Sequence, residues 1–335
     1  MEFEFFIGTD VSKNELDFAV RWGKELLFHR EIPNEPAAIK AFLKELSTLA
    51  GFHLNTAVFC MEHTGIYNNH LLDCLHKKKA NICLEASSHI KKSLGNIRGK
   101  NDKIDSIRIA EYAYDKREKL RMWTPKREIV QQLSHLAATR SRLLKVKKIL
   151  KTPLNEAGPF VKKSIAAQNL KVCNGTLTAI EADLKKVNKE IDKIISSDTE
   201  LKRIFNLTTS VCSIGAVIAT QVLISTNEFI DITDAKQFAC MGGMAPFTEE
   251  SGKFKGKGRI SHMANKKIKT LFHMAALVAI QHDPELKLFF ERKVNQDKKN
   301  KMSVINAIRN KLILRIFACV SQNRKYEKNY TRLVA

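Results

Sequence analysis

The sequence predicts an α/β domain at the N-terminus, a helical hairpin in the middle and a mostly helical region at the C-terminus. The first part of the 335-residue chain alternates short apolar segments with amphipathic ones, as α/β folds do. The middle carries apolar residues at spacings of three and four. The last part combines further helical segments with a glycine- and lysine-rich stretch. The predicted domains are residues 1–120, 121–205 and 206–335.

Three strands are expected to open the N-terminal domain. An apolar run at 3–10 precedes two β-rich segments at 15–21 and 25–31. Asn34 is the expected cap of the next helix, and Pro36 suits its first turn. The remaining predicted elements are helix 36–49, strand 56–61, helix 64–76, strand 80–85, helix 87–94 and helix 103–114. Three strands, helix, strand, helix, strand, helix is the order of the ribonuclease-H-like fold.

The middle domain carries two apolar stripes of helical period. The two stripes are Ile129, Leu133, Leu136, Leu143 and Leu150, and then Leu177, Ile180, Leu184, Val187, Ile191 and Ile194. Asn155, Gly158 and Pro159 mark a break between them. A long antiparallel hairpin fits this pattern. The second stripe has the spacing of a short coiled-coil seam, so it suits either a second subunit or packing within the chain.

The C-terminal domain is expected to be mostly helical. A short apolar helix begins near Ser213-Ile214-Gly215-Ala216, and a turn-rich segment follows at 241–246. The most basic stretch of the chain then covers 251–261. The predicted helices after it are 265–281, 284–294 and 303–321.

The net charge of +22 points to a polyanionic partner. Nucleic acid is the main candidate and an anionic membrane surface the lesser one. No apolar run is long enough to span a bilayer, and the acidic start Met1–Glu4 is unlike a signal peptide. The seven cysteines form no CxxC pair, which argues against a zinc site or a disulfide framework. A cytoplasmic protein with no membrane partner is expected.

Four acidic residues are the candidate metal ligands. Asp10 and Glu62 end two apolar strand segments, and Asp102 and Asp105 lie three apart at the start of a helix, on one face. Carboxylate oxygens are the ligands that Mg²⁺ (or Mn²⁺) prefers. Two such ions activate the attacking oxygen and stabilise the leaving oxygen in phosphoryl transfer. In so basic a chain the expected substrate is a nucleic-acid phosphate.

Ser251 starts the basic stretch and has two interpretations. Glycines at 252, 256 and 258 allow close approach of the backbone to phosphates. In the first interpretation Ser251 is a bystander in an exposed phosphate-binding loop. In the second it is a nucleophile that keeps the phosphodiester energy in a phosphoserine linkage. The residues assigned to nucleic-acid binding are Lys13, Lys253, Lys255, Lys257, Arg259, Lys266 and Lys267.

These residues resemble the motifs of one family. Its N-terminal motifs are matched by Ile7-Gly8-Thr9-Asp10-Val11-Ser12-Lys13, Glu62-His63-Thr64-Gly65-Ile66-Tyr67 and Lys103-Ile104-Asp105-Ser106, and its C-terminal motif by 243–252, 256–260 and Asn265. The chain thus resembles the DEDD-type transposases of the insertion-sequence family IS110, which is related to Piv-like DNA invertases. The order of the motifs matches over essentially the whole chain.

The resemblance implies a RuvC-like N-terminal domain with Asp10, Glu62, Asp102 and Asp105 as a magnesium-binding tetrad. It implies that Ser251 is the catalytic serine and acts with the tetrad at a composite site. It further implies donor and target DNA as substrates, a bridge RNA encoded by the element as guide, and a homodimer or homotetramer. The host would be bacterial or archaeal, with the protein at the nucleoid.

Two departures from the family pattern are present. Cys212-Ser213-Ile214-Gly215 stands where Pro-Gly-Ile-Gly is usual, and Ala264-Asn265 where Gly-Asn is usual. The first weakens the expectation that this turn contacts DNA in the usual way. Two alternatives stay open: a RuvC-like junction resolvase or nuclease, which needs the tetrad but not Ser251, and a catalytically silent nucleic-acid-binding protein derived from a transposase.

Overall fold

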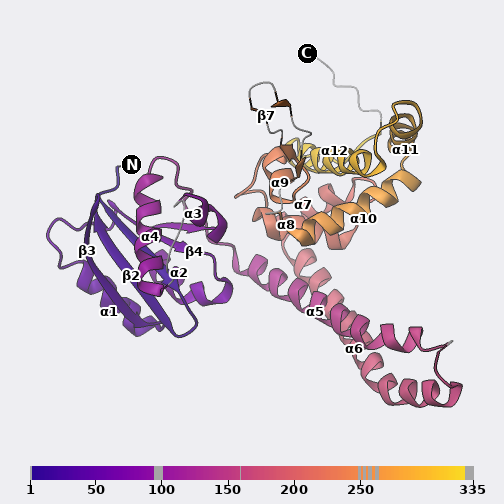
Figure 1. Ribbon diagram of the computed structural model, residues 1–335, viewed down its shortest axis with the longest axis horizontal. Helices are drawn as coiled ribbons and strands as arrows, with labels where there is room; N and C mark the ends of the chain where they lie inside the picture. The colour runs from indigo at the N-terminus through magenta and orange to yellow at the C-terminus, as the bar shows by residue number, and fades with distance from the viewer. Residues whose placement is uncertain are drawn as a thin grey trace. The chain divides into compact units, whose positions relative to one another are not determined.

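The computed structural model describes residues 2–93, 101–158, 160–247, 250–251, 254–255, 259–260 and 264–328. The chain divides into two compact units, Met1–Pro125 and Lys126–Ala335 (Figure 1). Each unit is described by itself. The finer division at residues 120 and 205 stays a prediction.

The first unit is built on a five-stranded mixed sheet. Its strands are β1 (Phe5–Val11), β2 (Glu15–Trp22), β3 (Glu25–Pro33), β4 (Ala57–Glu62) and β5 (Asn81–Glu85). The spatial order is β3-β2-β1-β4-β5. The first three strands form an antiparallel meander, whereas β4 runs parallel to both β1 and β5. The predicted α/β class of this region is confirmed, and each of the five predicted strands is present.

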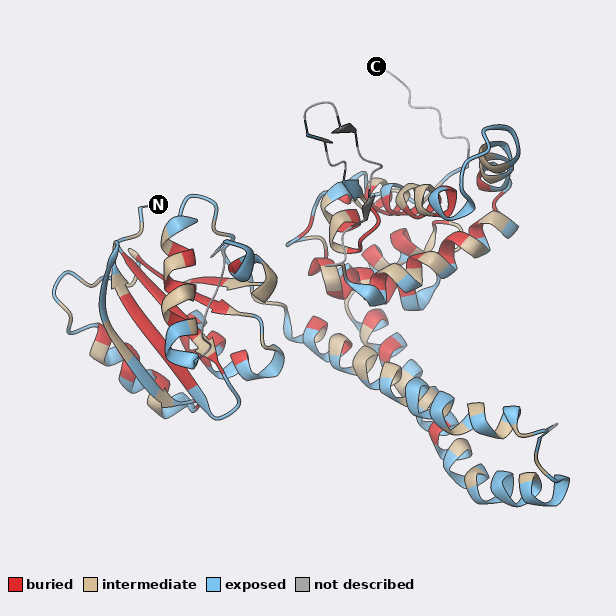
Figure 2. Cartoon of the chain, viewed as in Figure 1, coloured by how far each residue is buried: buried red, intermediate tan, exposed pale blue. Residues whose placement is uncertain are grey.

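Helices cover both faces of this sheet. They are α1 (Pro36–Leu46), the 3₁₀ turn η1 (Gly65–Asn68), α2 (Asn69–Lys77), α3 (Ser87–Ser93) and α4 (Asp102–Asp115). One apolar core joins α1 and α2 to one face, and a second joins α3 and α4 to the other. Adjacent strand residues point to opposite faces, so Phe5 lies in the first core and Phe6 in the second. Figure 2 shows the inner strands β1, β2 and β4 as mostly buried, whereas the edge strand β3 is not.

The predicted cap of α1 is wrong. Glu35, not Asn34, occupies the N-cap position, and it makes no side-chain capping bond. The Asn34 amide instead donates to the carbonyl oxygens of Ser12 (2.9 Å) and Tyr67 (3.0 Å). Asn34 is buried, and these bonds satisfy two carbonyls of separate turns. The Asn34 side chain therefore bridges two turns and does not cap α1.

The second unit begins with two long helices, α5 (Glu128–Glu156) and α6 (Lys163–Ser197). They pack against each other and run in opposite directions (Figure 1). Buried Leu133 of α5 meets Ile191 and Ile195 of α6 near the base of the pair. Farther along, both helices are mostly exposed (Figure 2). The helical hairpin expected in the middle of the chain is therefore present.

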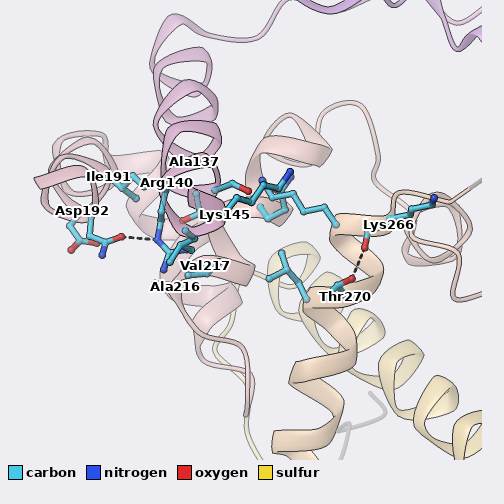
Figure 3. A pocket seen from close by; sticks show the side chains of 16 residues that line it. Ala137, Arg140, Lys145, Ile191, Asp192, Ala216, Val217, Lys266 and Thr270 are labelled. Carbon is cyan, nitrogen blue, oxygen red and sulfur yellow. Dashed lines mark hydrogen bonds between the residues drawn. The ribbon is translucent and has the colours of Figure 1, made fainter. Parts of the chain in front are cut away.

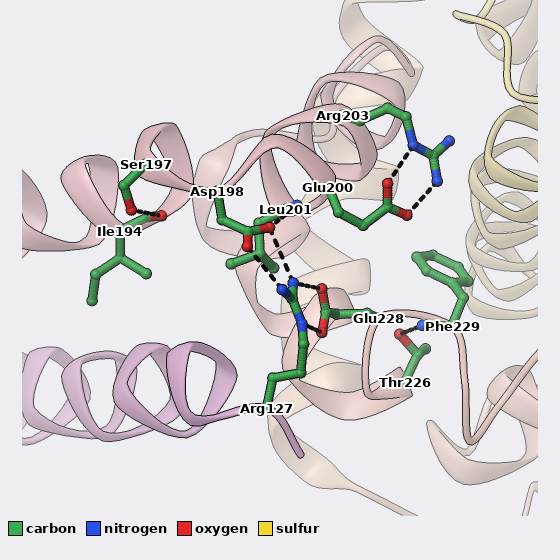
Figure 4. Close-up of polar contacts among 10 residues, drawn as sticks. All are labelled: Arg127, Ile194, Ser197, Asp198, Glu200, Leu201, Arg203, Thr226, Glu228 and Phe229. Carbon is green, nitrogen blue, oxygen red and sulfur yellow. Dashed lines mark hydrogen bonds and ion pairs between the residues drawn. The ribbon is translucent and has the colours of Figure 1, made fainter. Parts of the chain in front are cut away.

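Arg127 anchors this hairpin. Its guanidinium donates to both carboxylate oxygens of Asp198 (2.8 and 3.0 Å), at the junction of α6 with the next helix. It also pairs with Glu228, whose side chain is only 4% exposed (Figure 4). The Arg127 hydrogen bond lowers the pKa of Asp198 to about 2. The two ends of the hairpin are thus held together by one cation between two anions.

The remaining elements of the second unit are mostly helices. They are α7 (Thr199–Thr209), α8 (Ala216–Thr226), α9 (Ala235–Met241), α10 (Lys266–His282), α11 (Pro284–Glu291), the π-helical turn η2 (Arg292–Gln296) and α12 (Lys301–Ser321). Helices α8 to α12 surround one apolar core, and α7 packs in a smaller one with α5 and α8. Two two-stranded pairs lie between α9 and α10: β6 (Pro246–Phe247) with β9 (Arg259–Ile260), and β7 (Glu250–Ser251) with β8 (Phe254–Lys255). The predicted helical C-terminus is confirmed. None of the helices in the described ranges is long and apolar enough to cross a membrane.

Candidate active site

Two of the predicted ligands lie at neighbouring strand ends. Asp10 is the penultimate residue of β1, and Glu62 is the last residue of β4. The parallel ladder pairs Thr9 with Met61, so the two acids follow side by side at the same edge of the sheet. Both are half-buried. The strand-end positions expected from the apolar runs are those that the structure has.

The other two acids lie in the first turn of α4, where negative charge suits the helix dipole. Asp102 is exposed and Asp105 half-buried. Asn101 caps this helix, since its side chain accepts a hydrogen bond of 3.0 Å from the Ile104 N–H. The cap defines where the helix begins, and therefore which turn carries the two carboxylates.

Gly8 brings α4 close to β1. A Cβ at this position would lie 2.2 Å from the Ser106 carbonyl oxygen and 2.3 Å from the Ala110 nitrogen. Only glycine leaves room for the backbone of α4 to contact the strand so closely. Asp102 and Asp105 are consequently held near Asp10, two residues along β1.

The pKa of Asp10 responds to the charges of the other three acids. Burial, and then the negative charges of Asp102, Asp105 and Glu62, raise the pKa of Asp10 from 3.8 to about 6. A hydrogen bond of 3.0 Å from the Val11 N–H to Asp10 Oδ1 opposes this rise only partly. The site carries more negative charge than its own surroundings neutralise, which favours a cation.

The side chains of the four acids are not arranged as a metal-binding site in this structure. Within the described residues, no group of three or more His, Cys, Asp or Glu side chains is placed to hold a metal ion. The Asp105 carboxylate instead accepts from Arg108 at 2.9 Å, and Glu62 Oε2 accepts from Ser87 Oγ at 2.5 Å. Four carboxylates remain a donor set that suits a hard divalent cation. The role of the tetrad as metal ligands stays a prediction.

A fifth acid, Glu85, lies beside Glu62 at the end of β5. It accepts hydrogen bonds from the Tyr112 hydroxyl (3.0 Å) and pairs with His89 Nδ1 at 2.8 Å. Burial and the Glu85 charge raise the pKa of Tyr112, so its hydroxyl stays protonated as a donor. The sequence held a signal for Glu85, because it ends an apolar strand just as Asp10 and Glu62 do.

Ser251 is exposed at the end of β7, where it pairs with Phe254 of β8. It belongs to the second unit and the four acids to the first. A composite site and a nucleophilic role for Ser251 therefore stay predictions.

The predicted nucleic-acid-binding residues are spread over both units. Lys13 is exposed in the turn between β1 and β2, and Lys266 and Lys267 are exposed in the first turn of α10. Lys255 lies in β8 and Arg259 in β9. Lys253 and Lys257 lie outside the described residues.

Comparisons with known proteins identify the family. A model of the transposase IS116/IS110/IS902 family matches residues 206–291, which include Ser251. A transposase model for the DEDD enzymes of IS110 matches residues 7–156, which include the four acids. Similar proteins include the pilin gene-inverting proteins of Moraxella bovis and Moraxella lacunata, each 26% identical over 96% of this chain and 98% of their own. The insertion element IS900 uncharacterized 42 kDa protein of Mycobacterium paratuberculosis is 22% identical over 37% of this chain and 31% of its own.

The two family models match in the same order as the motifs quoted from the sequence: the DEDD model covers most of the first unit and helix α5 of the second, and the other lies within the second unit. The predicted resemblance is thereby confirmed. The chain belongs to the IS110 family of transposases and is an enzyme of DNA transposition and recombination.

Proposed function

We propose that this transposase cuts and rejoins donor and target DNA with Mg²⁺ (or Mn²⁺) at Asp10, Glu62, Asp102 and Asp105 and with Ser251 as nucleophile, guided by a bridge RNA encoded by the element. The observation that carries the metal part is the raised pKa of Asp10, which reports three other carboxylates around it. A RuvC-like assignment of the first unit is supported by its element order, which is that of ribonuclease-H-like domains.

Bound divalent ions would supply charge neutralisation at the attacking and leaving oxygens of the phosphodiester. The chain's own residues then have separate tasks. Glu62 is oriented by Ser87, and Asp10 is fixed through the Val11 N–H. Ser251 Oγ would attack phosphorus as its proton is released, while the strand oxygen of the broken P–O bond leaves with the electron pair and takes up a proton. One phosphodiester is exchanged for one phosphoserine ester. The freed hydroxyl of another strand can then attack this ester, form a new phosphodiester and release Ser251 without an external energy source.

With an RNA guide, base pairing would recognise the DNA sequence. The protein itself would bind the nucleic-acid backbone. The net charge of +22 supports a chain that holds both RNA and DNA. The name of the Moraxella relatives supports exchange of strands over simple hydrolysis. A homodimer or homotetramer would bring the tetrad of one subunit to Ser251 of another subunit. The protein would act at the nucleoid, in the cytoplasm of a bacterium or an archaeon.

The catalytic part is tested by a plasmid recombination assay on Ser251→Ala and Asp10→Asn, with Ser303→Ala as control. Ser303 is an exposed serine in the first turn of α12. We expect both site variants to lose recombination and the control to retain it. Strand cleavage by Ser251→Ala at the normal rate would favour the nuclease alternative, and full activity of Asp10→Asn would contradict the metal site.

The guide is tested by sequencing the RNA that co-purifies with the protein. A single abundant structured RNA, with segments complementary to donor and target DNA, is the expected result. A preparation that carries only a random sample of cellular RNA would contradict guidance, whatever the outcome for Ser251.

A further inference from the structure

A pocket of about 720 Å³ opens in the second unit between the hairpin and the C-terminal helices (Figure 3). Four elements line it: α5 and α6 of the hairpin, and α8 and α10 behind them. Six of its lining residues are small or aliphatic and come from all four helices, namely Ala137, Leu144, Ile191, Ala216, Val217 and Leu271. None of its lining residues belongs to the predicted catalytic set.

Four cations line the same pocket. Arg140 and Lys145 come from α5, and Lys266 and Lys267 from α10. Asp192 is the one carboxylate among the lining residues. The pocket therefore carries an excess of three positive charges, drawn from two helices that are more than 100 residues apart in the sequence.

Arg140 is held in place by a hydrogen bond, and none of the four cations is neutralised by an ion pair within the described residues. The Arg140 Nε–H donates to Asn188 Oδ1 at 2.8 Å, which orients the guanidinium across to α6 (Figure 3). No ion pair joins any of the four cations, or Asp192, to another charged group in the described part of the chain. Burial, and then the charges of Arg140 and Lys145, lower the pKa of Lys267. The cations on the two helices are thus close enough to repel one another.

The start of α8 adds backbone donors to this pocket. Gly215 is its N-cap and provides no side-chain capping bond. Within the described residues, the N–H groups of Ala216 and Val217 donate to no intramolecular acceptor, whereas those of Ile218 and Ala219 donate to the Gly215 carbonyl. Free N–H groups at a helix start favour an anion, and here they lie in a pocket that is already cationic.

We infer that this pocket binds a phosphate group of a nucleic-acid strand, with Arg140 and Lys145 on α5, Lys266 and Lys267 on α10, and the sugar against the aliphatic lining residues. The inference rests on the proposed function, because it takes nucleic acid as the ligand. It assigns a binding role to Arg140 and Lys145, which no sequence motif singled out. It also makes the hairpin and the C-terminal helices two sides of one site.

The chemistry of the lining favours backbone over base recognition. No Phe, Tyr or Trp is among the described lining residues, so the aromatic stacking that single-strand binders use for bases is missing. Cations and main-chain N–H groups instead recognise phosphate without regard to sequence. The site would hold a strand in place and leave its sequence to be read elsewhere.

The test compares two double variants with the same loss of charge. Lys145→Gln/Lys267→Gln removes one pocket cation from each side, and neither side chain makes a hydrogen bond to a described residue. Lys148→Gln/Lys269→Gln removes lysines of the same two helices that do not line the pocket. Both full-length proteins are titrated with duplex DNA, single-stranded DNA and RNA of equal length, by fluorescence anisotropy over a range of salt concentrations.

The pocket variant is expected to bind at least one of the three probes about tenfold more weakly than the control, with a salt dependence reduced by about one unit in the log–log slope. The probe with the largest loss identifies the strand, and equal losses identify a phosphate common to all three. Equal affinities of the two variants for every probe would overturn the site. Unmutated protein that binds none of the probes would instead contradict the proposed function. Melting curves of both variants verify folding.

Discussion

Ser87 Oγ donates a hydrogen bond of 2.5 Å to Oε2 of Glu62. Ser87 is the first residue of α3, and Glu62 is the last residue of β4. The bond occupies one carboxylate oxygen and orients the other. Groups that hold a metal ligand in this way set its geometry and its affinity for the ion.

Ser87→Ala should therefore weaken divalent metal binding by about tenfold, since lost ligand-orienting partners cost roughly 10- to 100-fold. Titration calorimetry with Mn²⁺ measures this directly. Ser93→Ala is the matched control, because Ser93 lies on the same helix and its hydroxyl, among the residues that the structure describes, bonds only to the Ile90 carbonyl. Equal metal affinity of the two variants would show that Ser87 does not orient a ligand.

Asp10 should make stability depend on pH in the absence of metal. Its pKa is raised from 3.8 to about 6, so the folded protein holds this proton more tightly than the unfolded chain does. The free energy of unfolding then falls as pH rises from about 4 to about 6, and the loss is complete above that range. Asp10→Asn removes the charge, so it should raise the melting temperature at pH 8 and leave it nearly unchanged at pH 4.

Thermal melts of Asp10→Asn across this pH range, in chelator, give the measurement. Asp73→Asn is the control, because Asp73 is an exposed acid on α2. A gain at pH 8 that is the same for both variants would mean that general surface charge, and not the acidic site, is responsible.

Gly8→Ala should destabilise the first unit by about 1–3 kcal/mol, because the new Cβ would overlap the backbone of α4. To relieve this overlap α4 would have to move away from β1. That movement would carry Asp102 and Asp105 away from Asp10, so the affinity for metal should fall as well. Urea unfolding and Mn²⁺ titration measure the two effects. Gly175→Ala offers a contrast, since a Cβ there meets no atom within 4 Å inside α6 and should stabilise that helix by about 0.5–1 kcal/mol. Unchanged stability of Gly8→Ala would refute the close packing of α4 on β1.

Arg127→Gln should destabilise the second unit by about 2 kcal/mol, because it leaves the buried Glu228 carboxylate without its partner. The part of this destabilisation that comes from losing the Arg127–Asp198 pair should vanish in acid. Its folded pKa of about 2 lies below the ordinary 3.8, so its contribution is present above about pH 4 and is lost as pH falls through 2. Lys186→Gln breaks an exposed pair with Asp183 and should change stability by less than about 0.5 kcal/mol. Chemical unfolding at pH 7 and pH 2 compares them, and equal effects of the two variants at pH 7 would exclude the anchoring role.

Helices α7 and α9 show where the sequence pattern was insufficient. The apolar residues of α7, Leu201, Ile204 and Leu207, continue the spacing of the hairpin. The predicted boundary at residue 205 lies within α7, so Leu201 and Ile204 were assigned to the middle domain and Leu207 to the C-terminal one. Asp198 caps α7 through the Leu201 N–H at 2.8 Å, and this capping residue was the available signal of a new helix. Helix α9 has seven residues, which is too short for a periodic pattern to be distinctive.

The sequence by itself determined the strands, the long helices, the family and the four acids, because each depends on local patterns of apolar and charged residues. Tertiary structure decided which of these residues meet. Three such meetings link residues far apart in the chain: the contact of α4 with Gly8, the hydrogen bond from Ser87 to Glu62, and the pocket that Arg140 and Lys267 both line. Such contacts follow from how helices pack on a sheet and on one another, which a local pattern does not encode.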